Sequence, residues 1–114
     1  VGVQGLGIAE VAMQQAVLYA AERLQGRHVD GAKMPEQPAD PIAVHADVQR
    51  MLLTMRSLTE GCRALAMETA LMSDLARRHP DASQRQDADD FVQLVTPILK
   101  HKRKTNKNGT VTIT

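Results

Sequence analysis

Apolar residues recur every three or four positions in three stretches of the chain. The first stretch covers about residues 4–24. Its apolar positions are Leu6, Ala9, Met13, Ala16, Val17, Ala20 and Leu24. Side chains at this spacing fall on one face of a helix, so the pattern predicts an amphipathic helix here. Three glycines, Gly2, Gly5 and Gly7, lower the helix propensity of its start.

The second stretch, from about Val44 to His79, is the longest and the most regular. Its repeating positions are Met51, Met55, Leu58, Cys62, Leu65, Thr69, Met72 and Leu75. A helix of this length extends over roughly 50 Å. Arg77 and Arg78 near its end complement the helix dipole, and Pro80 ends the helix.

The third stretch covers about residues 83–102. Its apolar stripe consists of Ala88, Phe91, Val95 and Ile98. Pro97 lies inside the pattern and predicts a kink. The period is lost after this stretch, and we expect the tail, residues 104–114, to be flexible.

The segment 26–41, between the first two predicted helices, contains two Gly and three Pro residues and has no apolar period. This composition predicts a loop. Asp40 and Pro41 at its end are expected to cap the following helix, with Pro41 in the first helical position.

Together these patterns predict an all-α fold: an up-down bundle of three main helices with a long middle helix and an irregular basic C-terminal tail. The helical domain is expected to span residues 1–103. Aromatic residues are scarce, with one Tyr, one Phe and no Trp. The core must therefore be built mainly from Leu, Met, Val and Ala.

Charge and cysteine content exclude several classes of protein. The 14 basic and 13 acidic residues nearly balance, which gives no case for nucleic-acid binding. No apolar run reaches the ~18 residues of a membrane span, and we expect a cytoplasmic protein. Cys62 is the single cysteine, which excludes an intrachain disulfide. Its position among apolar residues at helical spacing predicts a buried, inert thiol.

The remaining polar residues do not predict a metal site. No histidine stands at metal-ligand spacing from another His or from the Cys. The histidines are His28, His45, His79 and His101. Glu60 and Glu68 are isolated carboxylates, for which we expect salt bridges. The basic run 100–104 lacks interleaved aromatic residues and is expected to be solvated.

Several segments, taken in their order along the chain, resemble one family. They are VGVQGLGIAEVA, YAAERLQGR, ADPIAVHADV with the following RMLLTM, EGCRALA, and DDFVQLVTP. Together they resemble the C-terminal helical domain of FAD-dependent acyl-CoA dehydrogenases, closest to the subgroup that includes 3-methylmercaptopropionyl-CoA dehydrogenases. The resemblance covers roughly residues 1–99.

The resemblance implies that the chain is a fragment of an enzyme that oxidises acyl-CoA to trans-2-enoyl-CoA, with FAD as hydride acceptor. It places the carboxylate base and the flavin domain outside these residues. No catalytic residue is therefore assigned, and the isolated chain is expected to be inactive and to bind no FAD. One FAD per purified chain would contradict this expectation.

The resemblance also assigns candidate cofactor-binding residues. In the family, an Arg in an Arg-x-x-Phe-Gly motif at the end of this helix contacts the flavin nucleotide of the neighbouring subunit. Here the sequence reads Arg23-Leu24-Gln25-Gly26, without the Phe and with a spacing that is one residue shorter. By resemblance, Arg23 is the candidate for the flavin diphosphate, and Gln25 is the second candidate. His45 matches the family's His before the long helix, but Ala46 follows it in place of Gln or Pro.

The family resemblance further implies acyl-CoA as the substrate of the parent enzyme and a homo-oligomer, dimer or tetramer, built through the helices. Exposed apolar surface predicts a dimer through the Met-rich face of residues 51–75. Two alternatives remain open. One is a standalone helical interaction module whose basic tail recruits an acidic partner or nucleic acid, with salt-dependent binding that is lost on deletion of residues 100–114. The other is a structural helical bundle without a ligand.

Overall fold

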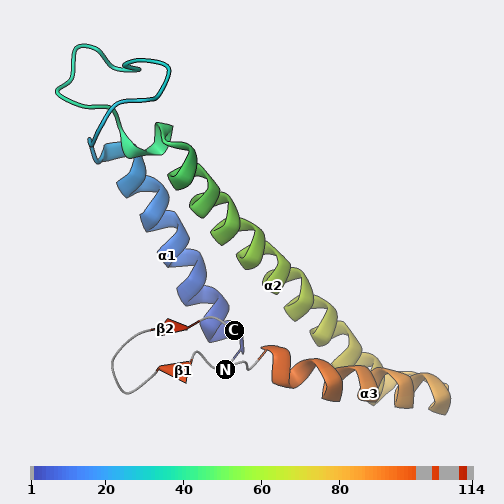
Figure 1. Ribbon diagram of the computed structural model, residues 1–114. Coiled ribbons are helices and arrows are strands. Elements are labelled where there is room, and N and C mark those ends of the chain that lie inside the picture. Colours follow the sequence, from blue (N-terminus) through green and yellow to red (C-terminus); the bar gives the residue numbers. More distant parts are fainter. Residues whose placement is uncertain (1, 100–103, 106–110, 113–114) are drawn as a thin grey trace. The chain divides into compact units, whose positions relative to one another are not determined.

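The computed structural model describes residues 2–99, 104–105 and 111–112. It contains three α-helices: α1 (Gly2–Glu22), α2 (Ala46–Arg78) and α3 (Ala82–Leu99), with a short 3-10 turn, η1 (Ile42–Val44), before α2 (Figure 1). The predicted all-α fold with three main helices and a long middle helix is confirmed. The predicted end of the third helix, Lys102, lies outside the described residues.

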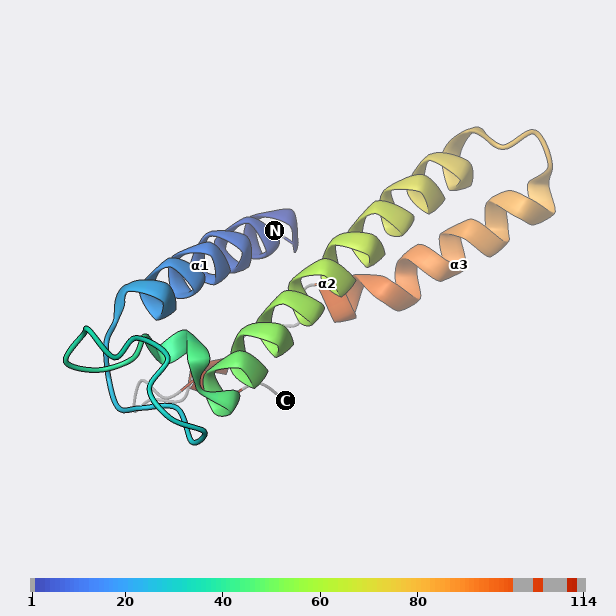
Figure 2. The same cartoon turned by 90° about the horizontal axis from the view of Figure 1, so that it is seen from above.

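The chain divides into two compact units, one of residues 3–63 and one of residues 1–2 with 64–114. In the first unit, α1 and the first half of α2 lie side by side and run in opposite directions (Figures 1 and 2). Met13 and Ala20 of α1 and Thr59 of α2 are buried in this unit. Met13 and Ala20 belong to the predicted apolar face of the first helix, which is confirmed at these positions.

The face that α2 buries in this unit differs from the predicted one. Thr59 is buried, whereas Leu58 is 58% exposed and Cys62 is exposed. The prediction of a buried Cys62 thiol is therefore wrong. The side of α2 that faces α1 also carries an ion pair: Nη2 of Arg63 lies 2.6 Å from the Glu10 carboxylate on α1. A helix that turns Arg63 toward α1 also turns Thr59, four residues earlier, in the same direction.

The second unit contains an antiparallel helical hairpin, in which α3 returns alongside the second half of α2 (Figure 2). Ala88 and Val95, both in the predicted stripe of α3, are buried. The turn is closed by Arg85, whose guanidinium donates to the carbonyl of His79 at 2.7 Å. Pro97 lies in the last turn of α3, and the helix continues past it to Leu99.

Two short strands are described in the tail. Lys104–Thr105 (β1) pairs antiparallel with Val111–Thr112 (β2), with Lys104 opposite Thr112. The predicted flexible tail, residues 104–114, and the basic run 100–104 otherwise lie outside the described residues. Of the helices that the structure describes, none has the length and apolar character needed to cross a bilayer.

Candidate functional site

The two residues predicted to contact a flavin lie where α1 passes into the loop. The chain leaves α1 at Arg23 and pairs with the segment that leads into α2, forming a short antiparallel ribbon. The Ile42 N–H donates to the carbonyl of Arg23 at 2.8 Å, and the Gln25 N–H donates to the carbonyl of Asp40 at 2.9 Å. Leu24 and Pro41 face each other between these bonds. The ribbon brings the two ends of the loop together and fixes the backbone of both candidates.

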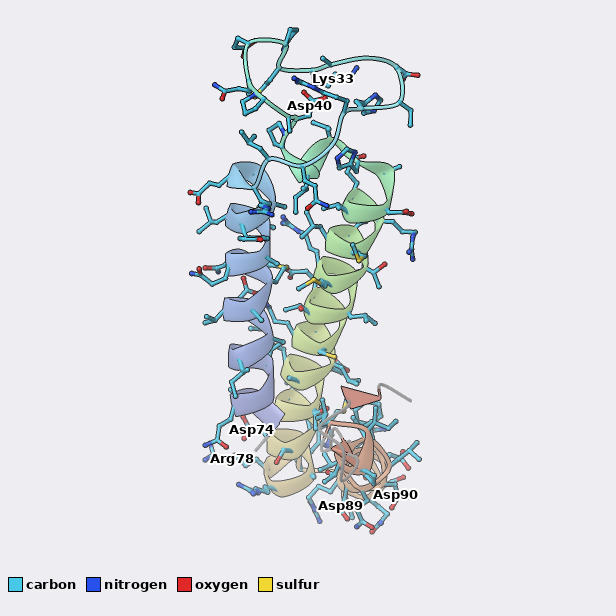
Figure 3. The ribbon with its side chains drawn as sticks, turned by 60° about the vertical axis from the view of Figure 1, so that its left-hand side comes forward. Lys33, Asp40, Asp74, Arg78, Asp89 and Asp90 are labelled. Atoms are coloured by element: carbon cyan, nitrogen blue, oxygen red, sulfur yellow. The ribbon has the colours of Figure 1, made fainter. Side chains whose placement is uncertain are left out.

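The loop between the strands of this ribbon is organised by the side chain of Asp40, which lies inside the loop near Lys33 (Figure 3). Asp40 has no exposed surface. Its carboxylate accepts backbone N–H bonds from His28 at 3.0 Å, Lys33 at 3.0 Å and Met34 at 2.8 Å. Arg27 adds a charged hydrogen bond at 3.2 Å. A single side chain thus satisfies donors from both halves of the loop.

Arg27 is fully engaged within the loop. Besides its bond to Asp40, its guanidinium donates to the carbonyl of Met34 at 2.9 Å and to that of Gln37 at 2.5 Å. These bonds hold the far side of the loop against its beginning. Arg27 is therefore a structural residue, even though it lies only four positions after the candidate Arg23.

The carboxyl group of Asp40 has a perturbed pKa. Its burial raises the pKa, but the backbone N–H groups of His28, Lys33 and Met34 and the guanidinium of Arg27 lower it by more. The net result holds the pKa well below the ordinary value of 3.8. Hydrogen bonds to the charged form of a carboxyl group favour that form, so Asp40 stays ionised in the folded loop.

This shift predicts that acid weakens the loop. The unfolded chain takes up a proton at Asp40 near pH 3.8, before the folded chain does. The stabilisation from Asp40 is therefore complete above that pH and is lost as the pH falls toward the folded-state pKa. In an NMR titration, the amide resonances of His28, Lys33 and Met34 should keep their native positions down to pH 3.8 and shift only below it. Shifts of these amide resonances centred on the ordinary pKa of an Asp carboxyl group would contradict the role of Asp40.

The predicted helix cap at Asp40 and Pro41 is wrong. The Asp40 carboxylate points back into the loop instead of capping a helix, and Pro41 precedes η1 without a side-chain cap bond. The start of α2 is organised by Gln49, whose side chain donates to the carbonyl of Ala43 at 3.0 Å. Within the loop the carboxylate accepts bonds from three N–H groups, which is more than an N-cap residue usually accepts. This difference explains why the side chain turns into the loop.

Arg23 and Gln25 differ from Arg27 in the state of their side chains. Both are exposed, and neither side chain makes a hydrogen bond or ion pair with any residue among 2–99. Their backbones, in contrast, are held by the ribbon. The guanidinium of Arg23 therefore has its donors free for an anion from outside residues 2–99.

His45 connects the ribbon to the start of α2. Its Nε2 lies 2.7 Å from the carbonyl oxygen of Gln25, and because that oxygen can only accept, Nε2 must carry a proton. The ring also lies 3.5 Å from the position that a Cβ would take at Gly26, where φ is +72°. A glycine is favoured there because other residues rarely adopt this conformation. His45 thus positions Gln25 through its backbone.

The other candidate residues do not form a second site in the described part of the chain. Glu60 lies 3.7 Å from Arg63 on the same helix, as a salt bridge. The residues with defined placement include no group of three or more His, Cys, Asp or Glu that could hold a metal ion. Glycines 5 and 7 have open space around the position of a Cβ, so no described backbone approaches them closely.

Asp40 and Arg27 are the residues whose importance the sequence reasoning missed. Their sequence signal is an acidic residue between Ala39 and Pro41, late in a loop that is rich in Gly and Pro. Asp in such loops often bonds nearby backbone N–H groups, which makes a local role more probable than a cap on the next helix.

Relatives of the chain have known activities. It is 49% identical over 100 residues to a 3-methylmercaptopropionyl-CoA dehydrogenase of Ruegeria pomeroyi. The aligned residues make up 88% of this chain and 16% of that protein. It is 30% identical over 99 residues to a butyryl-CoA dehydrogenase of Syntrophomonas wolfei, or 87% of this chain and 16% of that protein. Identity to a broad-specificity linear acyl-CoA dehydrogenase of Mycobacterium tuberculosis is 33% over 76 residues, 67% of this chain and 12% of the relative.

No protein-family model matches the chain, and no solved structure matches it. The chain spans about a sixth of the length of the first two relatives. The alignments nevertheless include the helix end and loop that hold Arg23 and Gln25, since they cover most of the chain. The chain is therefore homologous to acyl-CoA dehydrogenases, the family that its sequence motifs predicted.

Proposed function

We propose that this chain is a helical segment of an FAD-dependent acyl-CoA dehydrogenase, whose whole activity is the oxidation of an acyl-CoA to a trans-2-enoyl-CoA. The observation that carries the proposal is the alignment of 88% of the chain with 16% of a dehydrogenase at 49% identity. The role of the segment is to form part of the helical scaffold and to present Arg23 at the end of α1.

The residues at this helix end suit a diphosphate. The Arg23 guanidinium is exposed and unpaired among the described residues, whereas Arg27 is engaged by Asp40. A guanidinium with free donors matches the oxygens of a diphosphate in charge and geometry. Arg23 would hold the diphosphate of FAD, and the Gln25 side chain would offer a further polar contact beside it.

In such an enzyme, FAD supplies the hydride acceptor. The protein groups needed for the rest of the reaction are a carboxylate near the α-carbon and donors to the thioester carbonyl. The only carboxylate buried in the described part of this chain is Asp40, whose oxygens already accept hydrogen bonds from the loop backbone. The proposed role of the segment is therefore to bind and position FAD within the whole enzyme. The isolated chain is expected to be inactive and free of FAD.

The whole enzyme is expected to be a homo-oligomer that acts on acyl-CoA. By its resemblance to the family, Arg23 would lie against the flavin nucleotide of a neighbouring subunit, which would link oligomer formation to cofactor binding. An exposed guanidinium without a partner among residues 2–99 supports this arrangement.

The test is the DNA sequence of the locus on both sides of codons 1 and 114, read in all frames. We expect the upstream reading frame to encode a flavin-binding domain and the downstream sequence to encode further helices of a dehydrogenase. Neighbouring sequence without either feature in any frame would contradict the proposal and would favour the standalone interaction module.

A further inference from the structure

The ribbon that carries Arg23 and Gln25 leaves one backbone carbonyl to a side chain. Its backbone bonds pair the carbonyl of Arg23 with the Ile42 N–H, and the Gln25 N–H with the carbonyl of Asp40. Within residues 2–99, the carbonyl of Gln25 pairs only with Nε2 of His45, at 2.7 Å. The ring therefore completes the hydrogen bonding of the segment that enters the loop.

The backbone of His45 is itself anchored at the start of α2. Its N–H donates to the carbonyl of Ile42 at 3.1 Å, and its carbonyl accepts a bond from the N–H of Gln49 at 3.0 Å, in the first turn of α2. The first bond closes η1 and the second begins the bonding of the helix. A half-buried ring on this backbone can hold a segment that lies 20 positions earlier in the sequence.

The same ring lies against the turn that follows Gln25. Its Nε2 is 3.5 Å and its Cε1 is 3.6 Å from the position that a Cβ would take at Gly26. Gly26, with φ +72°, is where the chain turns from the ribbon into the loop. His45 thus holds this end of the ribbon by packing as well as by a hydrogen bond.

Direct binding of an anion does not fit the hydrogen bonding of the ring. Nε2 donates its proton to the Gln25 carbonyl and has no second proton to offer. In the neutral ring Nδ1 is then an acceptor, which repels a phosphate oxygen. Arg23, in contrast, is exposed and has no side-chain partner among residues 2–99. The guanidinium therefore suits the anion, and the ring suits the backbone beside it.

We infer that His45 is a positioning residue of the cofactor site: it holds the backbone of residues 23–26 against the start of α2 and makes no contact with the cofactor. This inference rests on the proposed function, because it takes Arg23 as the residue that binds the diphosphate of FAD. An arginine on a fixed backbone loses less freedom when it binds, and such preorganisation raises affinity without a new contact.

Hydrogen exchange in this chain tests the hold on the ribbon. His45→Leu removes the donor, whereas His45→Gln keeps an N–H donor at about the same reach as Nε2. The N–H groups of Gln25 and Ile42 should exchange at least about threefold faster in the Leu variant, because a neighbouring hydrogen bond is lost, and at the unmodified rate in the Gln variant. His79→Leu, the same change between α2 and α3, should leave both rates unchanged. Equal exchange in the His45→Leu variant and the unmodified chain would overturn the inference.

FAD affinity in a complete enzyme tests the positioning role. This chain replaces the aligned residues of the Ruegeria pomeroyi dehydrogenase, and flavin fluorescence reports binding to the apo-protein. His45→Leu should weaken FAD binding about 3- to 10-fold, and His45→Gln should restore it. The weakening should be equal at about pH 5.5 and about pH 8, on either side of the usual titration of histidine. A weakening confined to the lower pH, or no rescue by Gln, would indicate that a cationic ring binds the cofactor and would overturn the inference.

The two measurements distinguish a failure of this inference from a failure of the proposed function. An unmodified chimera that binds no FAD would contradict the proposed function and the cofactor role of His45 with it. Amide exchange in the isolated chain does not involve FAD, so it would still decide whether the ring holds the ribbon.

Discussion

Replacing Asp40 by Asn should free the loop while leaving the helices intact. The Asn side chain has the same shape, but its NH2 group would face backbone N–H groups that now donate to the carboxylate. Because one of the two carboxylate oxygens becomes an NH2 group, either the His28 N–H at 3.0 Å or the Met34 N–H at 2.8 Å would lose its acceptor, and Arg27 at 3.2 Å would lose a charged partner in both cases. Donors that lose a charged acceptor in a buried site become strongly destabilising.

The expected result is hydrogen exchange at the amides of His28, Lys33 and Met34 that is at least about tenfold faster than in the unmodified chain. Glu36→Gln is the matched control, because Glu36 lies in the same loop, is exposed, and makes no side-chain hydrogen bond or ion pair with residues 2–99. Its exchange rates should remain unchanged, and circular dichroism should show intact helices in both variants. Unchanged protection in the Asp40 variant would contradict the view that this side chain organises the loop.

The second large effect concerns Arg23 in a complete enzyme. A chimera can be made by replacing the aligned segment of about 100 residues in the Ruegeria pomeroyi dehydrogenase with the corresponding residues of this chain. In that chimera, Arg23→Gln should weaken FAD binding about 10- to 100-fold, because a hydrogen bond to a charged group contributes about 1.5–3 kcal/mol. Flavin fluorescence during titration of the apo-protein measures the change.

Two further variants separate a phosphate contact from a general effect of charge. Arg77→Gln removes the same charge at an exposed position near the end of α2 and should leave the affinity for FAD unchanged. Arg23→Lys keeps the charge but loses the planar, two-pronged donor, so it should restore only part of the affinity. Equal FAD affinities in the Arg23→Gln and unmodified chimeras would exclude Arg23 from the cofactor site.

The helices were predictable because each is encoded by a local period. The apolar face of α1 at Met13 and Ala20, and that of α3 at Ala88 and Val95, agree with the spacing of residues in the sequence. The end of α2 at Arg78, two residues before Pro80, follows from the inability of proline to continue a helix. Family membership was predictable because several motifs occur in the right order.

The rotation of α2 and the structure of the loop were not predictable in the same way. The period of α2 fits a face through Leu58 and Cys62 nearly as well as one through Thr59. The observed face carries the contact of Arg63 with Glu10, 53 positions away in the sequence, and a local period does not report such a contact. The role of Asp40 likewise depends on bonds to residues 6 to 12 positions earlier, which no helical or strand period describes.

The most direct test is whether this chain can serve as the corresponding segment of an acyl-CoA dehydrogenase. The measurement is the FAD content and the dehydrogenase activity of the unmodified chimera, beside the parent enzyme. We predict about one FAD per subunit and activity within about a hundredfold of the parent, since a displacement of about 1 Å far from the reacting atoms can cost about 100-fold in rate. A folded chimera that carries no flavin and shows no activity would contradict the claim that this chain is a dehydrogenase segment.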